Sequence, residues 1–229
     1  MIQVMIEEAG YEQSKIIIEN IDFSIPSGQM VGLIGGNGAG KSTTIQTLLG
    51  VIPYYKGNLS VPECGFVPER PILYTYYTLR EHIHLLVNLI QKAGLWNRAL
   101  ELCNLFRLDK HLDEYPTSFS KGMQQKVMLI LAFTPKYDFY ILDEPFMGLD
   151  PQAIRRLLIL LEQVKTDGAA ILISTHALDT AQQICDSFVC LHEGRLIRRG
   201  TLKEMQEKEG QTLLEIFDEL IEGTSDAII

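Results

Sequence analysis

Long apolar runs, paired cysteines and an excess of basic residues are all missing from this sequence of 229 residues. The longest apolar run, from Val127 to Phe133, is too short to cross a bilayer, so we expect no membrane span. None of the four cysteines forms a CxxC pair, which argues against a metal site or a disulfide framework. The N-terminal segment MIQVMIEEAG has neither the basic nor the apolar region of a signal peptide. These absences predict a cytosolic chain with reduced thiols.

Basic side chains are too few to favour a nucleic-acid partner. The chain has 20 Lys and Arg against 29 Asp and Glu, a formal net charge of −9. Such a surface repels the phosphates of nucleic acids and of anionic membranes, so neither is expected as the main partner. The length and a hydrophobic content of 46% suit a globular protein of one domain, with or without a subdomain.

Apolar patterns predict an α/β fold. Ile21, Phe23 and Ile25 alternate with polar residues, as in an antiparallel strand with one wet face, and we expect strands over about 2–7 and 16–25. Four other segments are continuous apolar runs, which are typical of parallel strands covered on both faces. They lie at about 30–34, 139–142, 169–173 and 187–191. The sequence therefore predicts a mostly parallel sheet with an N-terminal antiparallel β layer.

Helical patterns dominate the middle of the chain. Thr78 and Glu81 form a capping box ahead of an amphipathic helix, and a second helical pattern covers about 96–107. A third begins near Ser120, and Asp150 caps a further helix that runs to about residue 166. Because strand signals are absent between about 70 and 135, we interpret that block as a helical subdomain inserted into the α/β core.

The predicted organisation is one domain in several parts. Its core covers about 1–69 and 136–205, on either side of the inserted helices. An amphipathic helix over about 211–222 is expected to dock on its own domain. Arg195, Arg198 and Arg199 flank a short hairpin and are expected to lie on a solvated sheet edge.

A glycine-rich loop carries the clearest chemical signal. It matches G-x-x-x-x-G-K-[ST], and it lies between an apolar strand and a helical segment. Glycines let successive N–H groups turn toward an anion, and the helix N-terminus adds a partial positive charge. The lysine then supplies a cation for the β- and γ-phosphates, and the serine hydroxyl can bind Mg²⁺. The residues are Gly35, Gly36, Asn37, Gly38, Ala39, Gly40, Lys41 and Ser42, followed by Thr43.

Two adjacent acids follow the apolar strand at 139–142. Asp143 and Glu144 would be costly at the end of a buried strand unless they bound a metal or a water. Asp143 suits a contact with Mg²⁺, and Glu144 suits polarising the water that attacks a phosphate. A strand that simply ends in a solvated turn is the alternative, and the phosphate loop makes it the weaker one.

With these motifs, the sequence resembles the ATP-binding subunit of an ABC transporter over nearly its whole length. The segment FSKGMQQK at 119–126 resembles the family signature LSGGQQQR, and FMGLD at 146–150 resembles the D-loop. Ser174-Thr175-His176 resembles the strand end that carries the switch histidine, and GFVPE at 65–69 occupies the place of the Q-loop. The wording of the signature and of LDEPFMGLDP is most similar to the Ecs-type subgroup of bacterial exporters.

The resemblance implies a P-loop ATPase fold and a division of roles among the site residues. Lys41, Glu144 and His176 would be catalytic, and Ser42, Asp143 and Glu69 would hold Mg²⁺. The loop from Gly35 to Thr43 would bind ATP, and Tyr11 would stack on adenine. In a head-to-tail dimer with a second ATPase subunit, either a second copy or a paralogue, Ser120 and Gly122 of the signature would lie against the γ-phosphate held by the other subunit. Asp150 would also contact nucleotide. The resemblance also implies a separate membrane-spanning permease, which would hold this subunit at the cytoplasmic face of the membrane.

Three residues depart from the family pattern. Glu69 replaces the Q-loop glutamine, Lys121 replaces the first signature glycine, and Met123 replaces the signature glutamine. Glu69 can still ligate Mg²⁺ but adds a negative charge. Lys121 either adds a cation near the phosphates or points to solvent.

Two other functions compete with transport. A soluble ABC-type switch acting on ribosomes or DNA would resemble relatives that carry two such domains or long coiled-coil arms, which a single acidic chain does not match. A small P-loop kinase or GTPase would not place helices and a signature segment between Lys41 and Asp143, and no NKxD base-recognition motif is present. The sequence therefore favours an ATPase subunit that powers a transporter. Copurification with a membrane-spanning protein would separate this function from the other two.

Overall fold

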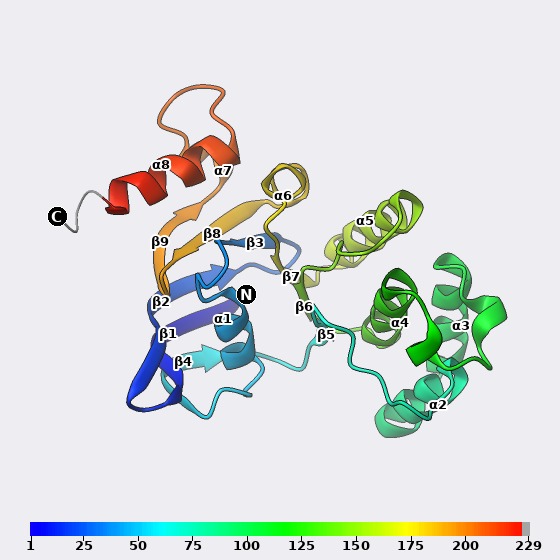
Figure 1. The fold of residues 1–229 in the computed structure, drawn as a ribbon. Coiled ribbons are helices and arrows are strands. Elements are labelled where there is room, and N and C mark those ends of the chain that lie inside the picture. Colours follow the sequence, from blue (N-terminus) through cyan, green and yellow to red (C-terminus); the bar gives the residue numbers. More distant parts are fainter. Residues whose placement is uncertain (226–229) are drawn as a thin grey trace.

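The computed structural model describes residues 1–225, with side chains up to residue 222, and within them one sheet of nine strands runs through the molecule (Figure 1). The strands are β1 (Ile2–Glu12), β2 (Lys15–Ile25), β3 (Met30–Ile34), β4 (Tyr54–Ser60), β5 (Gly65–Val67), β6 (Phe139–Asp143), β7 (Ala170–Ser174), β8 (Ser187–His192) and β9 (Arg195–Gly200). The helices are α1 (Lys41–Leu48), α2 (Leu79–Ile90), α3 (Leu95–Leu105), α4 (Lys121–Phe133), α5 (Pro151–Thr166), α6 (Leu178–Ile184), α7 (Leu202–Met205) and α8 (Leu213–Ser225), with 3-10 turns at Asp109–His111 and Pro116–Ser118. The strand order is β4-β1-β2-β9-β8-β3-β7-β6-β5.

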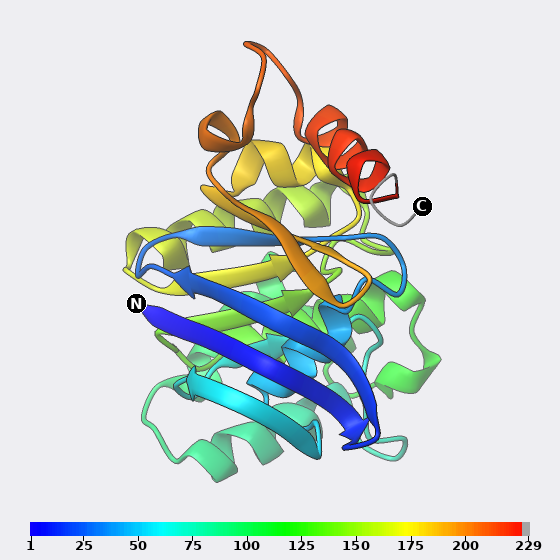
Figure 2. The same ribbon diagram turned by 90° about the vertical axis from the view of Figure 1, so that its left-hand side faces the viewer.

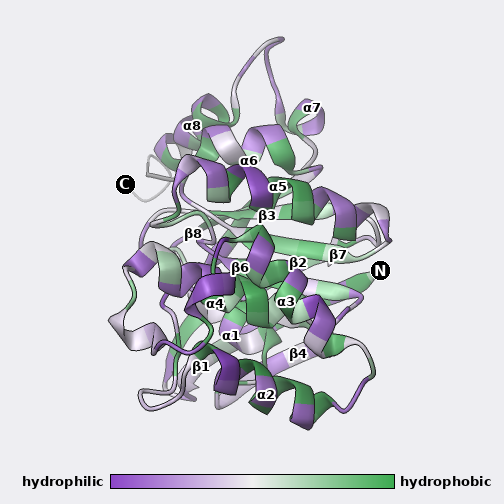
Figure 3. Cartoon of the chain, turned by 90° about the vertical axis from the view of Figure 1, so that its right-hand side faces the viewer, coloured by the Kyte–Doolittle hydropathy of each residue, from purple (hydrophilic) through white to green (hydrophobic). Residues whose placement is uncertain are grey.

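The centre of the sheet is parallel and fully buried. Strands β3, β7 and β6 are neighbours, and every one of their residues is buried. Alternate residues of β7 enter different cores, because Ile171 and Ile173 pack with α4 and α5 while Leu172 packs with α1. Figure 3 shows β3 and β7 coloured as hydrophobic. The parallel strands predicted from continuous apolar runs are confirmed.

The N-terminal strands form the antiparallel part of the same sheet. β1 pairs with β2 on one side and with β4 on the other, and the three lie side by side in Figure 2. Val4 and Ile6 of β1 are buried together with Ile21 and Phe23 of β2, in the cluster that also receives Ile45 of α1. The antiparallel strands with one buried face, predicted from the alternating pattern, are therefore confirmed.

The prediction that the arginine-rich hairpin strand lies at a sheet edge is wrong, whereas the predicted exposure of Arg195 and Arg199 to solvent is confirmed. β9, which carries Arg195, Arg198 and Arg199, lies inside the sheet between β2 and β8, whereas β4 and β5 form the edges. Arg195 forms an ion pair with Glu19, a residue of β2 that is distant in sequence. The sequence did not predict this position, because pairing between strands as distant in sequence as β2 and β9 leaves no local pattern.

Helices α2, α3 and α4 form a group of their own beside β5 and β6, away from the antiparallel strands (Figure 1). Their buried faces meet through Ile83 of α2, Ala99 of α3 and Val127 of α4. No strand occurs from residue 70 to residue 135, a stretch that the structure describes throughout. The predicted boundaries between core and helical subdomain stay a prediction.

The C-terminal helix α8 packs on the end of the sheet near α6 and β8 (Figure 1). Leu213, Ile216 and Phe217 are buried against Phe188 of β8 and Ile34, the last residue of β3. The amphipathic pattern thus faces the chain's own core, as expected from the sequence.

Candidate functional site

The carboxyl ends of three neighbouring strands bring the predicted residues together. β7 lies between β3 and β6, so the loop after Ile34, the segment after Ser174 and the pair Asp143-Glu144 emerge side by side. This is the position where open α/β sheets place their ligands. A cavity of about 660 Å³ opens there. It is lined by residues 36–43 and by Ile17, Glu69, Asp143, Glu144, Met147 and His176.

The glycine-rich loop holds an uncapped helix N-terminus over this cavity. Gly40 is the N-cap of α1, and at φ +101° it adopts a left-handed conformation that suits glycine. No side chain of the described residues caps α1, so its first N–H groups can bind an anion. The ammonium of Lys41 donates to the carbonyl oxygens of Gly35 at 2.6 Å and Gly36 at 3.1 Å. The loop therefore presents amide dipoles and one cation to the cavity.

Asp143 is a buried carboxylate that a neighbouring strand holds in place. Its side chain is 7% exposed, and the Ser174 hydroxyl donates to it from the end of β7. Burial raises the pKa of the Asp143 carboxyl, the Ser174 bond opposes that shift, and repulsion from Glu69 and Glu144 adds to it. A cation at this position would favour the ionised form, which is the electrostatic setting of a metal ligand.

Glu144 is positioned by its backbone as well as by its side chain. Its φ is +48°, a left-handed conformation that is uncommon for a residue other than glycine. The Glu144 N–H donates to the carbonyl oxygen of Ser174 at 3.0 Å, which stabilises this turn. Its carboxylate lies 2.9 Å from Nδ1 of His176. Strained backbone of this kind concentrates at functional sites, because surrounding contacts must hold it.

The signature segment begins α4 outside the cavity. Ser120 is the N-cap, and its hydroxyl accepts from the Met123 N–H at 3.3 Å, as predicted from the sequence. Gly122 packs directly on the backbone of Gly148, where any Cβ would overlap the Gly148 carbonyl oxygen. Glycine at position 122 is thus required within this chain, whatever it contacts in another.

The D-loop is also joined to the signature helix by an ion pair. The Lys126 ammonium lies 2.6 Å from Oδ2 of Asp150, and Oδ1 of Asp150 accepts from the Ala153 N–H at 2.9 Å. The bond to Lys126 is the main reason that the pKa of Asp150 is lowered, to about 2. Asp150 is therefore engaged within its own chain, as an N-cap of α5 and as an ion-pair partner.

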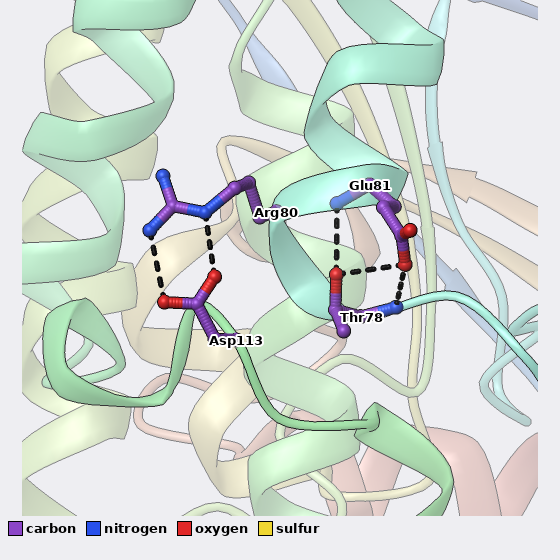
Figure 4. A network of polar contacts seen from close by, with 4 residues as sticks. All are labelled: Thr78, Arg80, Glu81 and Asp113. Atoms are coloured by element: carbon purple, nitrogen blue, oxygen red, sulfur yellow. Dashed lines mark hydrogen bonds and ion pairs between the residues drawn. The ribbon is translucent and has the colours of Figure 1, made fainter.

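A second set of contacts fixes the segment that leads into the signature (Figure 4). The Thr78 hydroxyl accepts from the Glu81 N–H, and the Glu81 carboxylate accepts from the Thr78 N–H at 2.7 Å, which completes the predicted capping box. Arg80 donates to both carboxylate oxygens of Asp113, at 2.7 and 3.1 Å. Its N–H also donates to the carbonyl oxygen of Leu112 at 2.8 Å. These bonds hold the start of α2 against the segment at residues 112–113, which precedes the signature.

Five of the predicted site residues do not line the cavity. Gly35 directly precedes the lining part of the loop, and its carbonyl oxygen accepts from the Lys41 ammonium. Ser120, Gly122 and Asp150 belong to the signature and D-loop surface, and Tyr11 lies at the end of β1. The Tyr11 hydroxyl donates to Oε1 of Gln46 on α1 at 2.9 Å, and 52% of the residue is exposed.

Sequence reasoning assigned no role to several residues that the structure brings to the site. Ile17 and Met147 line the cavity, and Ser174 holds Asp143. Ser174 had a signal that could have been used, since it ends the strand next to Asp143. Met147 also had a signal, since it lies in the D-loop three residues after Glu144 and its N–H donates to the Glu144 carbonyl oxygen. Ile17 had none, because its approach to the loop depends on the whole fold.

A comparison with protein families decides the classification. The ABC transporter family profile matches residues 18–147, which hold the glycine-rich loop, the signature and the acidic strand end. The chain belongs to the ABC transporter ATP-binding family. An ABC ATP-binding subunit of this kind is an ATPase.

Known relatives agree with this assignment over nearly the whole chain. The ATP-binding protein YthP of Bacillus subtilis is 44% identical over 97% of this chain and 98% of its own, and is described as uncharacterized. The ABC-type transporter ATP-binding protein EcsA of the same organism is 40% identical over 95% and 94%. The predicted Ecs-type resemblance is confirmed at this level.

Solved structures show the same fold. An ATP-binding subunit of an ABC transporter superposes with a TM-score of 0.91 at 38% identity, over 96% of this chain and 99% of that one. The dimeric cassette MJ0796 superposes with a TM-score of 0.77 at 23% identity, over 88% and 99%. The ABC ATPase fold, with its P-loop and mostly parallel sheet, is thereby confirmed. Among the helices of the described residues, none is long and apolar enough to cross a membrane.

Proposed function

We propose that this ATPase subunit powers a membrane exporter, as one half of a head-to-tail pair bound to a separate permease at the cytoplasmic face of the membrane. The observation that carries the proposal is the division of the site between two surfaces of one chain. The cavity holds the loop, Glu144 and His176, while Ser120 and Gly122 begin a helix that lies outside it. A second copy supplies what the cavity lacks.

In the proposed reaction, the chain holds the phosphates and activates a water. The uncapped N-terminus of α1 and the Lys41 ammonium bind the β- and γ-phosphates. Glu144 accepts the proton of the attacking water, and the contact at 2.9 Å with His176 orients that carboxylate. Tyr11, anchored through Gln46 to α1, offers its exposed ring to adenine.

The oxygen donors of the cavity suit magnesium. The described residues contain no group of three or more His, Cys, Asp or Glu side chains that could hold a metal ion alone. Ser42, Asp143 and Glu69 line one cavity, and Mg²⁺ is usually bound by one or two carboxylates together with phosphate oxygens. These three residues would hold the ion, which would neutralise charge on the β- and γ-phosphates.

The Glu144→Gln variant tests the proposal most directly. Glutamine keeps the shape of the side chain but cannot take the proton, so ATP should bind normally and be hydrolysed very slowly. ATP held between two copies stabilises only the paired state. We expect a dimer in Mg-ATP and a monomer without nucleotide, measured by light scattering on size exclusion.

Two further variants show whether Ser120 forms part of the pairing surface. Adding Ser120→Arg to Glu144→Gln should abolish the dimer, because bulk and charge replace the hydroxyl at the docking position. Thr201→Arg is the matched control, since Thr201 also caps a helix, α7, but lies outside the signature segment. A Glu144→Gln protein that stays monomeric in saturating Mg-ATP contradicts the head-to-tail pair for the isolated chain.

The membrane partner is tested separately. Affinity purification of the tagged chain from detergent-solubilised membranes should recover a polytopic membrane protein. Recovery of ribosomes or DNA without such a protein would favour a soluble ABC-type switch instead. The exporter direction is supported by the likeness to the Ecs-type subgroup and is tested by substrate accumulation in cells lacking the subunit.

A further inference from the structure

The side chains that line the cavity carry more negative than positive charge. Three carboxylates line it, those of Glu69, Asp143 and Glu144, and Lys41 is the ammonium group among the lining residues. Mg-ATP itself carries a net negative charge. The helix N-terminus of α1 offsets part of the repulsion, since a helix end carries roughly half an elementary charge. The cavity as one chain builds it is therefore short of positive charge.

Glu69 contributes to this excess without a stabilising contact. It is exposed, directly follows Pro68 after β5, and forms no hydrogen bond or ion pair with the residues that the structure describes. Its charge repels the carboxylate of Asp143. Apart from the contact with Mg²⁺ proposed above, no contact with the residues that the structure describes accounts for a carboxylate rather than a neutral amide at this position.

Lys121 presents the opposite problem on the other surface. It is the first residue of α4, is exposed, and has no hydrogen-bond or ion-pair partner in the described part of the chain. The first turn of α4 contains no acidic residue. A cation at a helix N-terminus is unfavourable because it faces the positive end of the helix dipole. The fold of one chain therefore disfavours this lysine.

The two unexplained charges complement each other if two copies meet. Lys121 directly follows Ser120, which the head-to-tail pair places against the phosphates held by the other copy. We propose that Lys121 of one copy pairs with Glu69 of the other, beside the shared ATP, and thereby supplies the missing cation. The pair rests on the proposed head-to-tail dimer, and its partner is a second copy of this chain.

A double-mutant cycle in the Glu144→Gln background tests the pair. Lys121→Met keeps the length of the side chain and removes the charge, and Glu69→Gln does the same for the carboxylate. The measurement is the dissociation constant of the dimer in Mg-ATP, by sedimentation velocity. We expect Lys121→Met to weaken the dimer, and to weaken it less in the Glu69→Gln background by a factor on the order of three or more.

Controls separate this pair from general effects. Lys110→Met removes another exposed cation, one that lies outside the signature, and should leave the dimer unchanged. Lys121→Met should also raise the denaturant midpoint of the monomer slightly, because an unfavourable helix-end charge is removed. The coupling should shrink as salt is added.

The outcomes distinguish a failure of the charge pair from a failure of the dimer. A Glu144→Gln parent that dimerises, with the same cost for Lys121→Met in both backgrounds, overturns the charge pair and leaves the dimer standing. A parent that stays monomeric overturns the dimer of the isolated chain, and the pair with it. A lower cost of Lys121→Met when Glu69 is neutral supports both.

Discussion

Removing the charge of Asp150 should destabilise the protein by an amount that depends on pH. Its carboxylate is bound to Lys126 and to the Ala153 N–H, and its pKa falls from 3.8 to about 2. At roughly 1.4 kcal/mol per pH unit, this shift corresponds to about 2–3 kcal/mol. Because 52% of the Asp150 side chain is exposed, solvent screening reduces the value to about 1 kcal/mol.

Two substitutions separate the ion pair from the helix cap. Asparagine is as good an N-cap as aspartate, so Asp150→Asn should lose only the ion pair, about 1 kcal/mol. Asp150→Ala should lose the cap as well, about 1 kcal/mol more. Lys126→Met should cost as much as Asp150→Asn, and the two combined should cost little more than either alone. Urea unfolding near neutral pH measures all four.

The sign of the pH dependence follows from the lowered pKa. A carboxyl group whose pKa is lower in the folded state stabilises that state fully above the unfolded pKa, 3.8, and loses this contribution as pH falls toward about 2. The difference in unfolding free energy between wild type and Asp150→Asn should therefore shrink over this window. Equal stability near neutral pH, or a difference that persists at the acidic end, would refute the reasoning.

Three other substitutions test the site and its support. Lys41→Ala should abolish tight ATP binding, since the cation on the phosphates is lost; calorimetric titration with unchanged affinity would rule out the phosphate-loop assignment. Glu69→Gln should keep ATPase activity but shift the Mg²⁺ concentration for half-maximal rate, and identical Mg²⁺ profiles would mean that Glu69 is not near the metal. Gly122→Ala should cost about 1–3 kcal/mol in urea unfolding, because the methyl group overlaps the Gly148 carbonyl oxygen; an unchanged midpoint would contradict this packing.

Most of the fold could be predicted because its strongest signals are local. The buried strands β3, β6 and β7 are continuous apolar runs, and the helix caps Thr78, Ser120 and Asp150 bond to residues only three positions away. The edge strands β4 and β5 were not predicted, because their local signals are weak. β4 is mostly exposed and β5 has three residues, so neither produces a period that can be recognised.

The site divides in a similar way. The glycine-rich loop and the pair Asp143-Glu144 are contiguous motifs whose chemistry the sequence states. The contact of Gly122 with Gly148 joins residues that approach only after α4 has packed beside the D-loop. No pattern within a short window encodes such a meeting, since it depends on the packing of whole elements.

The burial of Ile34 gives the C-terminal helix a place in the architecture of nucleotide binding. Ile34 is the last residue of β3 before the glycine-rich loop, and it shares its core cluster with Leu213, Ile216 and Phe217 of α8. Helix α8 thus packs against the strand that leads into the phosphate loop. Removing α8 would expose part of the core around Ile34 to water. The strand end that positions the glycine-rich loop would then lose part of its packing.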